Sequence, residues 1–376
     1  ISDYINLVPT KDMSKIKIEK APIQEFYPLS SAQRRIYYNC KMIGEDNTVY
    51  NMPGGILVDE ILDYDKVKKV VEKIIERHTI LRTSFVLEND TVMQKIHDDI
   101  HIDIPVFYNK ENEIKKIEEK FKRPFSLEKA PLIRVEIHYI DNKKTLVLME
   151  THHIVMDGTS LNNFIIEFER LYNGDNLKRI PIQYKDYSVW ENNVNKSEEA
   201  KRIENYWINK FKGSEIPSLN LPYDYPNPTT PSFVGDRLIK NLNDELINKI
   251  NILANDLQVS PYMIFISAYF ILLYKYTGQN EIIVGTPFAN RNISETNNII
   301  GMFVNNLCVD AKIDSNISFV EFLNNIKEQI LSDINNGIYP YDLLIKKLNI
   351  PNNTQLFNTM FTYQNTASNK FIINGK

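Results

Sequence analysis

A proline-rich stretch at residues 179–231 separates two sets of alternating helix and strand patterns, and this division constrains the fold most strongly. Proline removes a backbone donor and interrupts helices and sheets, so the stretch is expected to cross between two folded lobes, with a helix near 198–212. Before this stretch, the periodicity predicts helices at 64–78, 111–121 and 159–173 and strands at 81–88, 91–97, 131–140 and 144–152. After it, the periodicity predicts helices at 243–256, 261–277, 317–336 and 340–348 and strands at 233–240, 281–286, 302–312 and 356–363. This order predicts an α/β protein with two lobes of similar size, and 43% hydrophobic residues among 376 are enough for two cores.

The charge pattern argues against nucleic acid as a partner. The formal net charge is −4, and lysines are interleaved with acidic residues, as in 111–122, so no face is strongly basic. The N-terminus has no signal-peptide pattern, and the longest apolar run, 261–273, is shorter than the roughly 20 residues of a membrane-spanning helix. Cys40 and Cys308 are interpreted as buried free thiols in a reducing compartment. We therefore expect a cytoplasmic protein with no membrane contact.

Two adjacent histidines, His152 and His153, end the apolar strand at 144–152 and are followed by Asp157, Gly158 and a helix. Neighbouring strand residues point to opposite faces, so one imidazole is expected to face a core and the other a cavity. Gly158 lets the backbone bend, and the helix that follows offers free N–H groups and the positive end of its dipole. An imidazole beside such a helix start can move a proton while the N–H groups stabilise an oxyanion, as acyl transfer requires.

A structural or metal-binding histidine pair is the alternative to a catalytic one. A zinc site needs three or four ligands at matching spacing, and no other Cys or His pair in the sequence provides them, so no metal is expected. The residues alone leave the catalytic and the structural interpretation open.

The stretch HHIVMDG at 152–158 resembles the HHxxxDG signature of condensation domains of nonribosomal peptide synthetases, a branch of the chloramphenicol-acetyltransferase-like superfamily. Six further segments resemble the other motifs of that family in the same order: PLSSAQRRIY at 28–37, RHTILRTSF at 77–85, YKDYSVW at 184–190, IGMFVNNLC at 300–308, YPYDLL at 339–344 and LFNTMFTY at 356–363. The departures are Thr79 for a usual Glu, Asn306 for a usual Thr, and a weak lead-in to the seventh motif at 352–355.

The resemblance implies two chloramphenicol-acetyltransferase-like lobes in a V-shaped pseudodimer, with the active site at their interface. Residues 27–185 would form the N-terminal lobe and 186–376 the C-terminal lobe. We expect the C-terminal lobe to be truncated, because family members continue past the seventh motif. Residues 1–26 resemble the end of a carrier protein followed by a linker.

The activity implied by the resemblance is that of an acyltransferase in peptide antibiotic biosynthesis. It would form a peptide bond between a donor acyl or peptidyl thioester and an acceptor aminoacyl thioester. Both would be tethered to phosphopantetheine arms, one on an upstream donor carrier protein and one on a downstream acceptor carrier protein, with an adenylation domain adjacent. The domain itself would bind no cofactor and no metal.

Other members of the superfamily set the alternatives. A heterocyclisation domain would replace the histidine pair by Asp, and an epimerisation domain would differ from the condensation form at 300–308. A catalytically silent docking module usually lacks the second histidine, whereas His153 is present here. A CoA-dependent acyltransferase would share the same His and Asp, but the linker and the other motifs argue against it.

The resemblance also implies roles for the residues of the signature. His153 would face the substrate tunnel as positioner of the amine and proton acceptor, and His152 would hydrogen-bond inward. Asp157 would be structural, paired with Arg291 or, as second candidate, with Arg82. Gly158 would present its N–H to the oxyanion.

Five residues outside the signature complete the expected site. Arg77 is expected to give structural support, and Trp190 and Tyr184 to pack in the core. Asn305 and Ser160 are expected to border the substrate tunnel.

Overall fold

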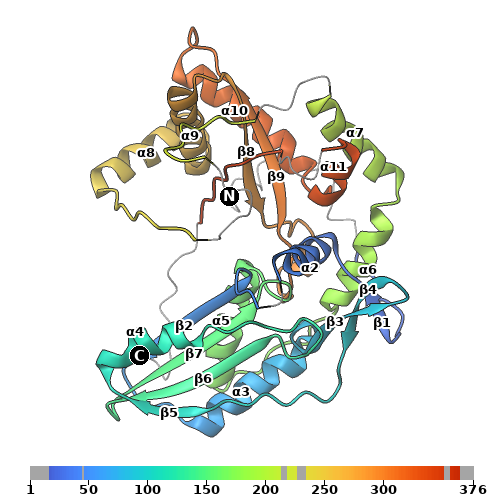
Figure 1. Cartoon of the computed structure of the whole chain (residues 1–376), viewed down its shortest axis with the longest axis vertical. Helices are drawn as coiled ribbons and strands as arrows, with labels where there is room; N and C mark the ends of the chain where they lie inside the picture. Colours follow the sequence, from blue (N-terminus) through green and yellow to red (C-terminus); the bar gives the residue numbers. More distant parts are fainter. Residues whose placement is uncertain (1–16, 45, 213–217, 227–233, 351–355, 365–376) are drawn as a thin grey trace. The chain divides into compact units, whose positions relative to one another are not determined.

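The computed structural model describes residues 17–44, 46–212, 218–226, 234–350 and 356–364, which fall into two compact units (Figure 1). The N-terminal unit contains 17–197 together with Arg291–Val304, and the C-terminal unit contains Glu198–Asn290 and the described residues from Asn305 onward. The expected boundary at 185–186 falls inside helix α6 (Tyr184–Val194), and the division lies after Ser197 instead. The reason is that Tyr184 and Tyr187 of α6 are buried in the N-terminal core.

The N-terminal unit contains a three-stranded and a four-stranded sheet. Its strands are β1 (Phe26–Pro28), β2 (Asn51–Val58), β3 (Thr83–Glu88), β4 (Thr91–Ile96), β5 (Val106–Asn109), β6 (Ile133–Ile140) and β7 (Lys144–His152), and its helices, besides α6, are α2 (Ser31–Ile43), α3 (Tyr64–Arg77), α4 (Ile114–Phe121) and α5 (Gly158–Tyr172). The first sheet has the order β1-β4-β3, and the second has the order β2-β7-β6-β5, in which only β5–β6 is parallel.

Side-chain alternation explains how helices cover both faces of the four-stranded sheet. Val135 and Ile137 of β6 pack in one core with the apolar stripe of α3 and with Phe164 and Phe168 of α5. On the other face, Leu146 and Leu148 of β7 pack against Phe121 of α4. Because β7 is covered on both faces, its sequence is almost continuously apolar rather than alternating.

The last residues of the expected linker are part of the folded unit. Ile18 is buried in the N-terminal core, and the backbone N–H of Ala21 donates to the carboxylate of Asp186 at 2.9 Å. The expectation that 1–26 is a linker is therefore corrected for 17–26, whereas 1–16 lie outside the described residues.

The C-terminal unit is built around the antiparallel pair β8 (Glu281–Phe288) and β9 (Asn305–Lys312). Its helices are α7 (Glu198–Phe211), α8 (Asp244–Asp256), α9 (Pro261–Thr277), α10 (Phe319–Asn335) and α11 (Tyr341–Lys347). Ile282 and Val284 face the core formed with α9 and α10, and Ile283 faces the core formed with α7 and α11. Burial on both faces accounts for the uninterrupted apolar run of β8.

Two expected strands of the C-terminal unit are wrong. Residues 234–240 have no regular structure, and Leu238 is 95% exposed, because no described strand lies beside them to complete their backbone hydrogen bonds. The expected strand at 356–363 is reduced to one bridge between Met360 and Gly285. The helices expected after residue 240 are all present within a few residues of their predicted ends.

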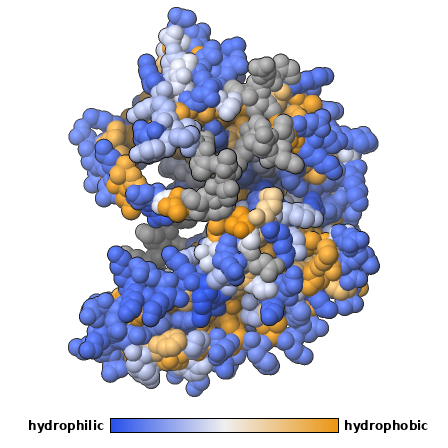
Figure 2. Space-filling model, in the orientation of Figure 1, coloured by the Kyte–Doolittle hydropathy of each residue, from blue (hydrophilic) through white to orange (hydrophobic). Residues whose placement is uncertain are grey.

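The surface and the apolar helices agree with the composition. Figure 2 shows hydrophilic side chains over most of the face in view, with hydrophobic side chains in separate patches. No single helix in the described parts of the chain is long and apolar enough to cross a membrane; α8 and α9 meet that criterion only as a pair, bent by 106° at the break between them. Cys40 and Cys308 are buried free thiols, as predicted.

Candidate functional site

The two histidines lie where β7 ends, and three buried apolar residues anchor the turn that follows them. β2 pairs with β7 so that Asn51 stands opposite His152, and the N–H of His153 extends the ladder by donating to the carbonyl of Tyr50 at 2.8 Å. Ile154, Val155 and Met156 are fully buried in the N-terminal core. Their burial leaves the turn little freedom between the strand and α5.

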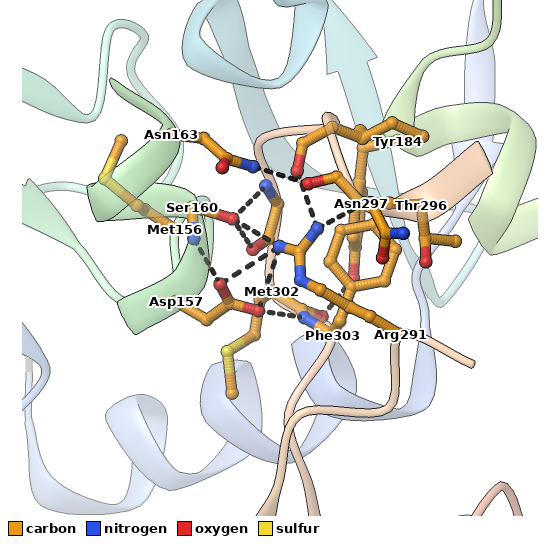
Figure 3. Close-up of polar contacts among 12 residues, drawn as sticks. Met156, Asp157, Ser160, Asn163, Tyr184, Arg291, Thr296, Asn297, Met302 and Phe303 are labelled. Carbon is orange, nitrogen blue, oxygen red and sulfur yellow. Dashed lines mark hydrogen bonds and ion pairs between the residues drawn. The ribbon is translucent and has the colours of Figure 1, made fainter. Parts of the chain in front are cut away.

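Asp157 caps α5 and is fully buried, and all of its partners lie in the N-terminal unit (Figure 3). Its Oδ1 accepts the N–H of Ser160 at 2.8 Å, and its Oδ2 accepts the N–H of Phe303 at 3.0 Å. Nη2 of Arg291 lies 3.1 Å from Oδ1 and 3.3 Å from Oδ2. Arg291, the first expected partner, is therefore the residue that pairs with Asp157.

The guanidinium of Arg291 has further partners that offset its burial. Its Nη1 donates to the carbonyls of Thr296 and Ile299, and its Nη2 donates to Oγ of Ser160 at 2.7 Å. The guanidinium carbon lies 4.1 Å from the centre of the Phe303 ring, a cation–π arrangement. The ion pair thus attaches the segment Arg291–Val304 to the start of α5.

Ser160, which was expected to border the substrate tunnel, uses its hydroxyl in hydrogen bonds within the N-terminal unit. Its side chain is fully buried, its hydroxyl donates to the carbonyl of Gly301 at 2.8 Å, and it accepts the N–H of the same residue at 3.0 Å. The position of Ser160 in the first turn of α5 directs the hydroxyl toward the backbone of the returning segment. Its role is structural.

His152 points inward, as expected. Its Nδ1 accepts the N–H of Ile154 at 3.2 Å, so the proton of the neutral ring is assigned to Nε2, which lies 3.7 Å from Sγ of Cys40. Burial, and secondarily the neighbouring His153, lowers the pKa of His152 to about 3. His152 is therefore a neutral residue of the core at neutral pH.

His153 is partly buried and differs from His152 in its surroundings. Burial lowers its pKa below the ordinary 6.5; the carbonyls of His153 and Met156 and the carboxylate of Asp157 oppose this effect, and the charge of Arg35 adds to it. Nδ1 is buried and has no hydrogen-bond partner among the described atoms. The lowered pKa favours the neutral imidazole at pH 7.

Gly158 is the first residue of α5 and is exposed. No heavy atom beyond its chain neighbours and its own helix backbone lies within 4 Å of the place where a Cβ would stand. A helix start with open space beside it is able to accept a polar group of a ligand at its N–H groups.

The other expected support residues serve the core. Arg77 pairs with Glu167 at 3.0 Å and so links α3 to α5, and Trp190 packs at the edge of the N-terminal core. Tyr184 is fully buried, and its hydroxyl contacts Oγ of Ser30 and the carbonyl of Met302. Arg82, the second candidate partner of Asp157, donates instead to the carbonyl of His97 at 2.6 Å, because it stands at the start of β3 beside the end of β4.

Asn305 lies in the C-terminal unit, and its amide is fully used there. Nδ2 donates to the carbonyls of Gly337 and Tyr339 at 2.9 and 2.7 Å, and Oδ1 accepts the N–H of Tyr341 at 3.1 Å. Asn305 was expected to border a tunnel; its side chain closes the turn before α11.

Arg35, to which the sequence alone gives no role, lowers the pKa of His153 through its charge. Nη2 of Arg35 donates to the carbonyl of Val304 at 3.1 Å, at the end of the returning segment. Its position inside the first motif, PLSSAQRRIY, was the available signal. Among the described residues, no group of three or more His, Cys, Asp or Glu side chains is placed to hold a metal ion.

Comparisons with known proteins identify the family of the chain. A family model described as "Condensation domain" matches residues 23–375. The chain is 38% identical over 374 residues to gramicidin S synthase 2 of Brevibacillus brevis and 40% identical over 354 residues to surfactin synthase subunit 1 of Bacillus subtilis (strain 168). These matches cover 99% and 93% of this chain but span only 8% and 10% of the relatives' length.

Solved structures share the fold at low sequence identity. The X-domain from teicoplanin biosynthesis superposes with a TM-score of 0.83 at 18% identity, covering 92% of this chain and 79% of that one. A four-domain nonribosomal peptide synthetase, holo-AB3403, gives a TM-score of 0.79 at 18% identity, covering 95% of this chain and 28% of that one. The first condensation domain of the calcium-dependent antibiotic synthetase gives 0.71 at 15% identity, covering 93% and 80%.

Removing one partner of the buried ion pair should destabilise the chain. Asp157→Asn leaves the Arg291 charge uncompensated, and we expect a loss of about 3–5 kcal/mol in the free energy of unfolding, with a similar loss for Arg291→Met. The double variant should lose less than the sum of the two single variants by at least about 1 kcal/mol. Urea unfolding followed by circular dichroism measures all three.

An exposed ion pair serves as the matched control for this comparison of the single and double variants. Glu245 and Lys249 of α8 lie 2.6 Å apart with side chains 75% and 69% exposed, so Glu245→Gln should change the unfolding free energy little. Strict additivity of Asp157→Asn and Arg291→Met would contradict a direct interaction.

The depressed pKa of His152 predicts acid sensitivity. The imidazole of His152 takes up a proton near pH 6.5 in the unfolded chain but only near pH 3 in the folded chain. The free energy of unfolding therefore has its full value above pH 6.5 and decreases as the pH falls below it. Between these two pH values, the contribution of His152 to the slope of the unfolding free energy against pH should approach about 1.4 kcal/mol per pH unit. The variant His152→Asn, which retains an acceptor for the N–H of Ile154, should lack this contribution, so its unfolding free energy should depend less on pH.

Urea titrations at a series of pH values measure the slope. His101→Asn, at an exposed position, is the matched control and should leave the slope as in the wild type. The same slope in His152→Asn as in the wild type would show that the acid sensitivity arises elsewhere.

Proposed function

Because the chain belongs to the condensation-domain family of nonribosomal peptide synthetases, we propose that it forms an amide bond between two carrier-tethered acyl groups. The observation that carries the proposal is His153: a neutral imidazole at the end of β7, directly before the start of α5. This arrangement combines a proton acceptor with N–H groups that can meet a developing oxyanion.

In the proposed reaction, the amine nitrogen of the acceptor attacks the carbonyl carbon of the donor thioester. A carbon–nitrogen bond forms, the carbon–sulfur bond breaks, and the donor's acyl group moves to the acceptor. The amine gives up one proton, which His153 accepts and which finally protonates the departing thiolate. Atoms and charges balance without an oxidant, a reductant or a metal ion.

The demand on His153 as a base is modest. A free α-amine has a pKa near 7.7–8.0, so roughly a tenth of it is already neutral at pH 7. Orienting that amine and removing a proton as the tetrahedral adduct forms are the larger tasks. The lowered pKa of His153 suits them, because it keeps the ring able to accept a proton throughout the neutral range.

The neighbouring residues would support His153 without touching the reacting atoms. Asp157, held by Arg291, fixes the turn between β7 and α5, and His152 anchors it from inside. Gly158, with open space beside it, would present its N–H to the oxyanion. The buried Nδ1 of His153 leaves Nε2 as the nitrogen that faces the amine.

The partners follow from the reaction. The phosphopantetheine arms would belong to an upstream donor and a downstream acceptor carrier protein, and an adenylation domain would load the acceptor. The chain matches parts of much longer peptide synthetases, which supports a place within such an assembly. The cytoplasm, where such synthetases would find their amino acids and ATP, is the proposed location.

Replacing His153 by Ala should slow amide formation about a hundredfold without unfolding the chain, because proton acceptance and positioning are lost together. The measurement is single-turnover dipeptide formation with donor and acceptor carrier proteins, each loaded with an aminoacyl group, quenched at short times. Circular dichroism checks the fold of the variant, and His101→Ala is the matched control.

Each outcome separates this proposal from its alternatives. Equal rates in wild type and His153→Ala would refute the role of His153. No product from the wild type, with carrier binding retained, would favour a docking module, and transfer from acyl-CoA instead of loaded carriers would favour a CoA-dependent acyltransferase.

A further inference from the structure

An apolar pocket opens in the N-terminal unit between the four-stranded sheet and α5. Its volume is about 170 Å³, and every residue that lines it is a glycine or has a hydrocarbon or thioether side chain. The residues that matter for its position are Gly54 and Ile56 of β2, Val147 and Met149 of β7, and Leu161 and Ile165 of α5.

The size and lining of this pocket indicate the class of ligand. An engineered apolar cavity of about 150 Å³ stays dry and binds benzene, so this pocket can hold a group between an isobutyl and a benzyl group in size. A charged or strongly polar group would lose its hydration there without gaining a hydrogen bond. The pocket therefore discriminates by apolar volume.

Strand register places the pocket near His153. Gly54 pairs with Met149, three residues along β2 from the pair Asn51–His152, and three residues of a strand span about 10 Å. Side chains alternate along β7 and its extension, so His153 belongs to the same face as Met149. The pocket therefore lies about 10 Å from His153, on the same face of the sheet.

The residues of the pocket lining that reach solvent include members of β2, which is an edge strand, and of α5. Leu161 and Ile165, one and two turns into α5, are only partly buried, and Gly54 is exposed. A carbonyl held at the N–H groups of Gly158 would therefore have its acyl substituent directed along the first turns of α5, past Leu161. The amine of the other substrate would stand on the side of His153.

We propose that this pocket binds the apolar side chain of the donor aminoacyl group and so sets a preference for large aliphatic or aromatic donors. The proposal rests on the proposed amide-forming function, and it names the substrate class of that site. Gly54 is the residue that keeps the pocket open, because a Cβ at this position would meet no heavy atom within 4 Å. A larger side chain there would add bulk at the lining of the pocket.

The test compares donors that differ only in side chain. Alanyl, leucyl and phenylalanyl donor carriers are offered with one constant acceptor, and single-turnover rates are measured. We expect the wild type to use leucyl and phenylalanyl donors about tenfold faster than the alanyl donor, as the added apolar groups of a substrate typically allow. In Gly54→Leu, the ratio of leucyl to alanyl rates should fall about tenfold.

A matched control stands on the same strand. Leu57 lies on the opposite face of β2 and is 43% exposed, so Leu57→Phe adds bulk outside the pocket and should keep the wild-type ratio. An unchanged ratio in Gly54→Leu, or equal use of all three donors by the wild type, would overturn the proposal.

A binding measurement separates failure of the pocket from failure of the amide-forming function. Toluene should raise the melting temperature of the wild type and of Leu57→Phe, but not that of Gly54→Leu. If no donor reacts yet toluene behaves in this way, the amide-forming function fails and the pocket stands as an apolar binding site. If toluene leaves the wild-type melting temperature unchanged, the proposal fails whatever the rates are.

Discussion

Asp157 and Arg291 form a buried ion pair that joins the start of α5 to a segment 134 residues later in the chain. Burying two charges is costly, and removing only one partner would leave the other uncompensated. The backbone offsets this cost: N–H groups of Ser160 and Phe303 donate to the carboxylate, and carbonyls of Thr296 and Ile299 accept from the guanidinium. The pair therefore specifies one arrangement of these segments.

The pair also explains why two adjacent histidines have different environments. Asp157 fixes the end of the turn, and the buried run Ile154–Val155–Met156 fixes its middle, so the two rings must point to opposite faces of the strand end. His152 enters the core and is held neutral by burial, whereas His153 stays partly exposed, and burial lowers its pKa. One ring anchors the turn, and the other is the proposed proton acceptor.

The sequence predicted what local pattern and motif spacing encode. Helix stripes and the hairpin β6–β7 were accessible from the pattern, whereas the inward His152 and the partner Arg291 followed from the family resemblance. The backbone partners of Ser160 and Asn305 were not predicted, because a polar residue type does not tell whether nearby backbone groups will form its hydrogen bonds. The return of Arg291–Val304 to the N-terminal unit and the pocket beside Gly54 depend on contacts between distant segments, which no local pattern records.

The central claim is that the buried pair presents His153 as a neutral imidazole, and the most direct measurement is an NMR titration of its ring nitrogens in wild type and Arg291→Met. We expect the wild-type midpoint below 6.5, because burial lowers the pKa of His153. In Arg291→Met the midpoint should rise toward 6.5 or above, since the turn loosens and the Asp157 charge is no longer compensated. A wild-type midpoint at or above 6.5, or the same midpoint in both proteins, would contradict the account.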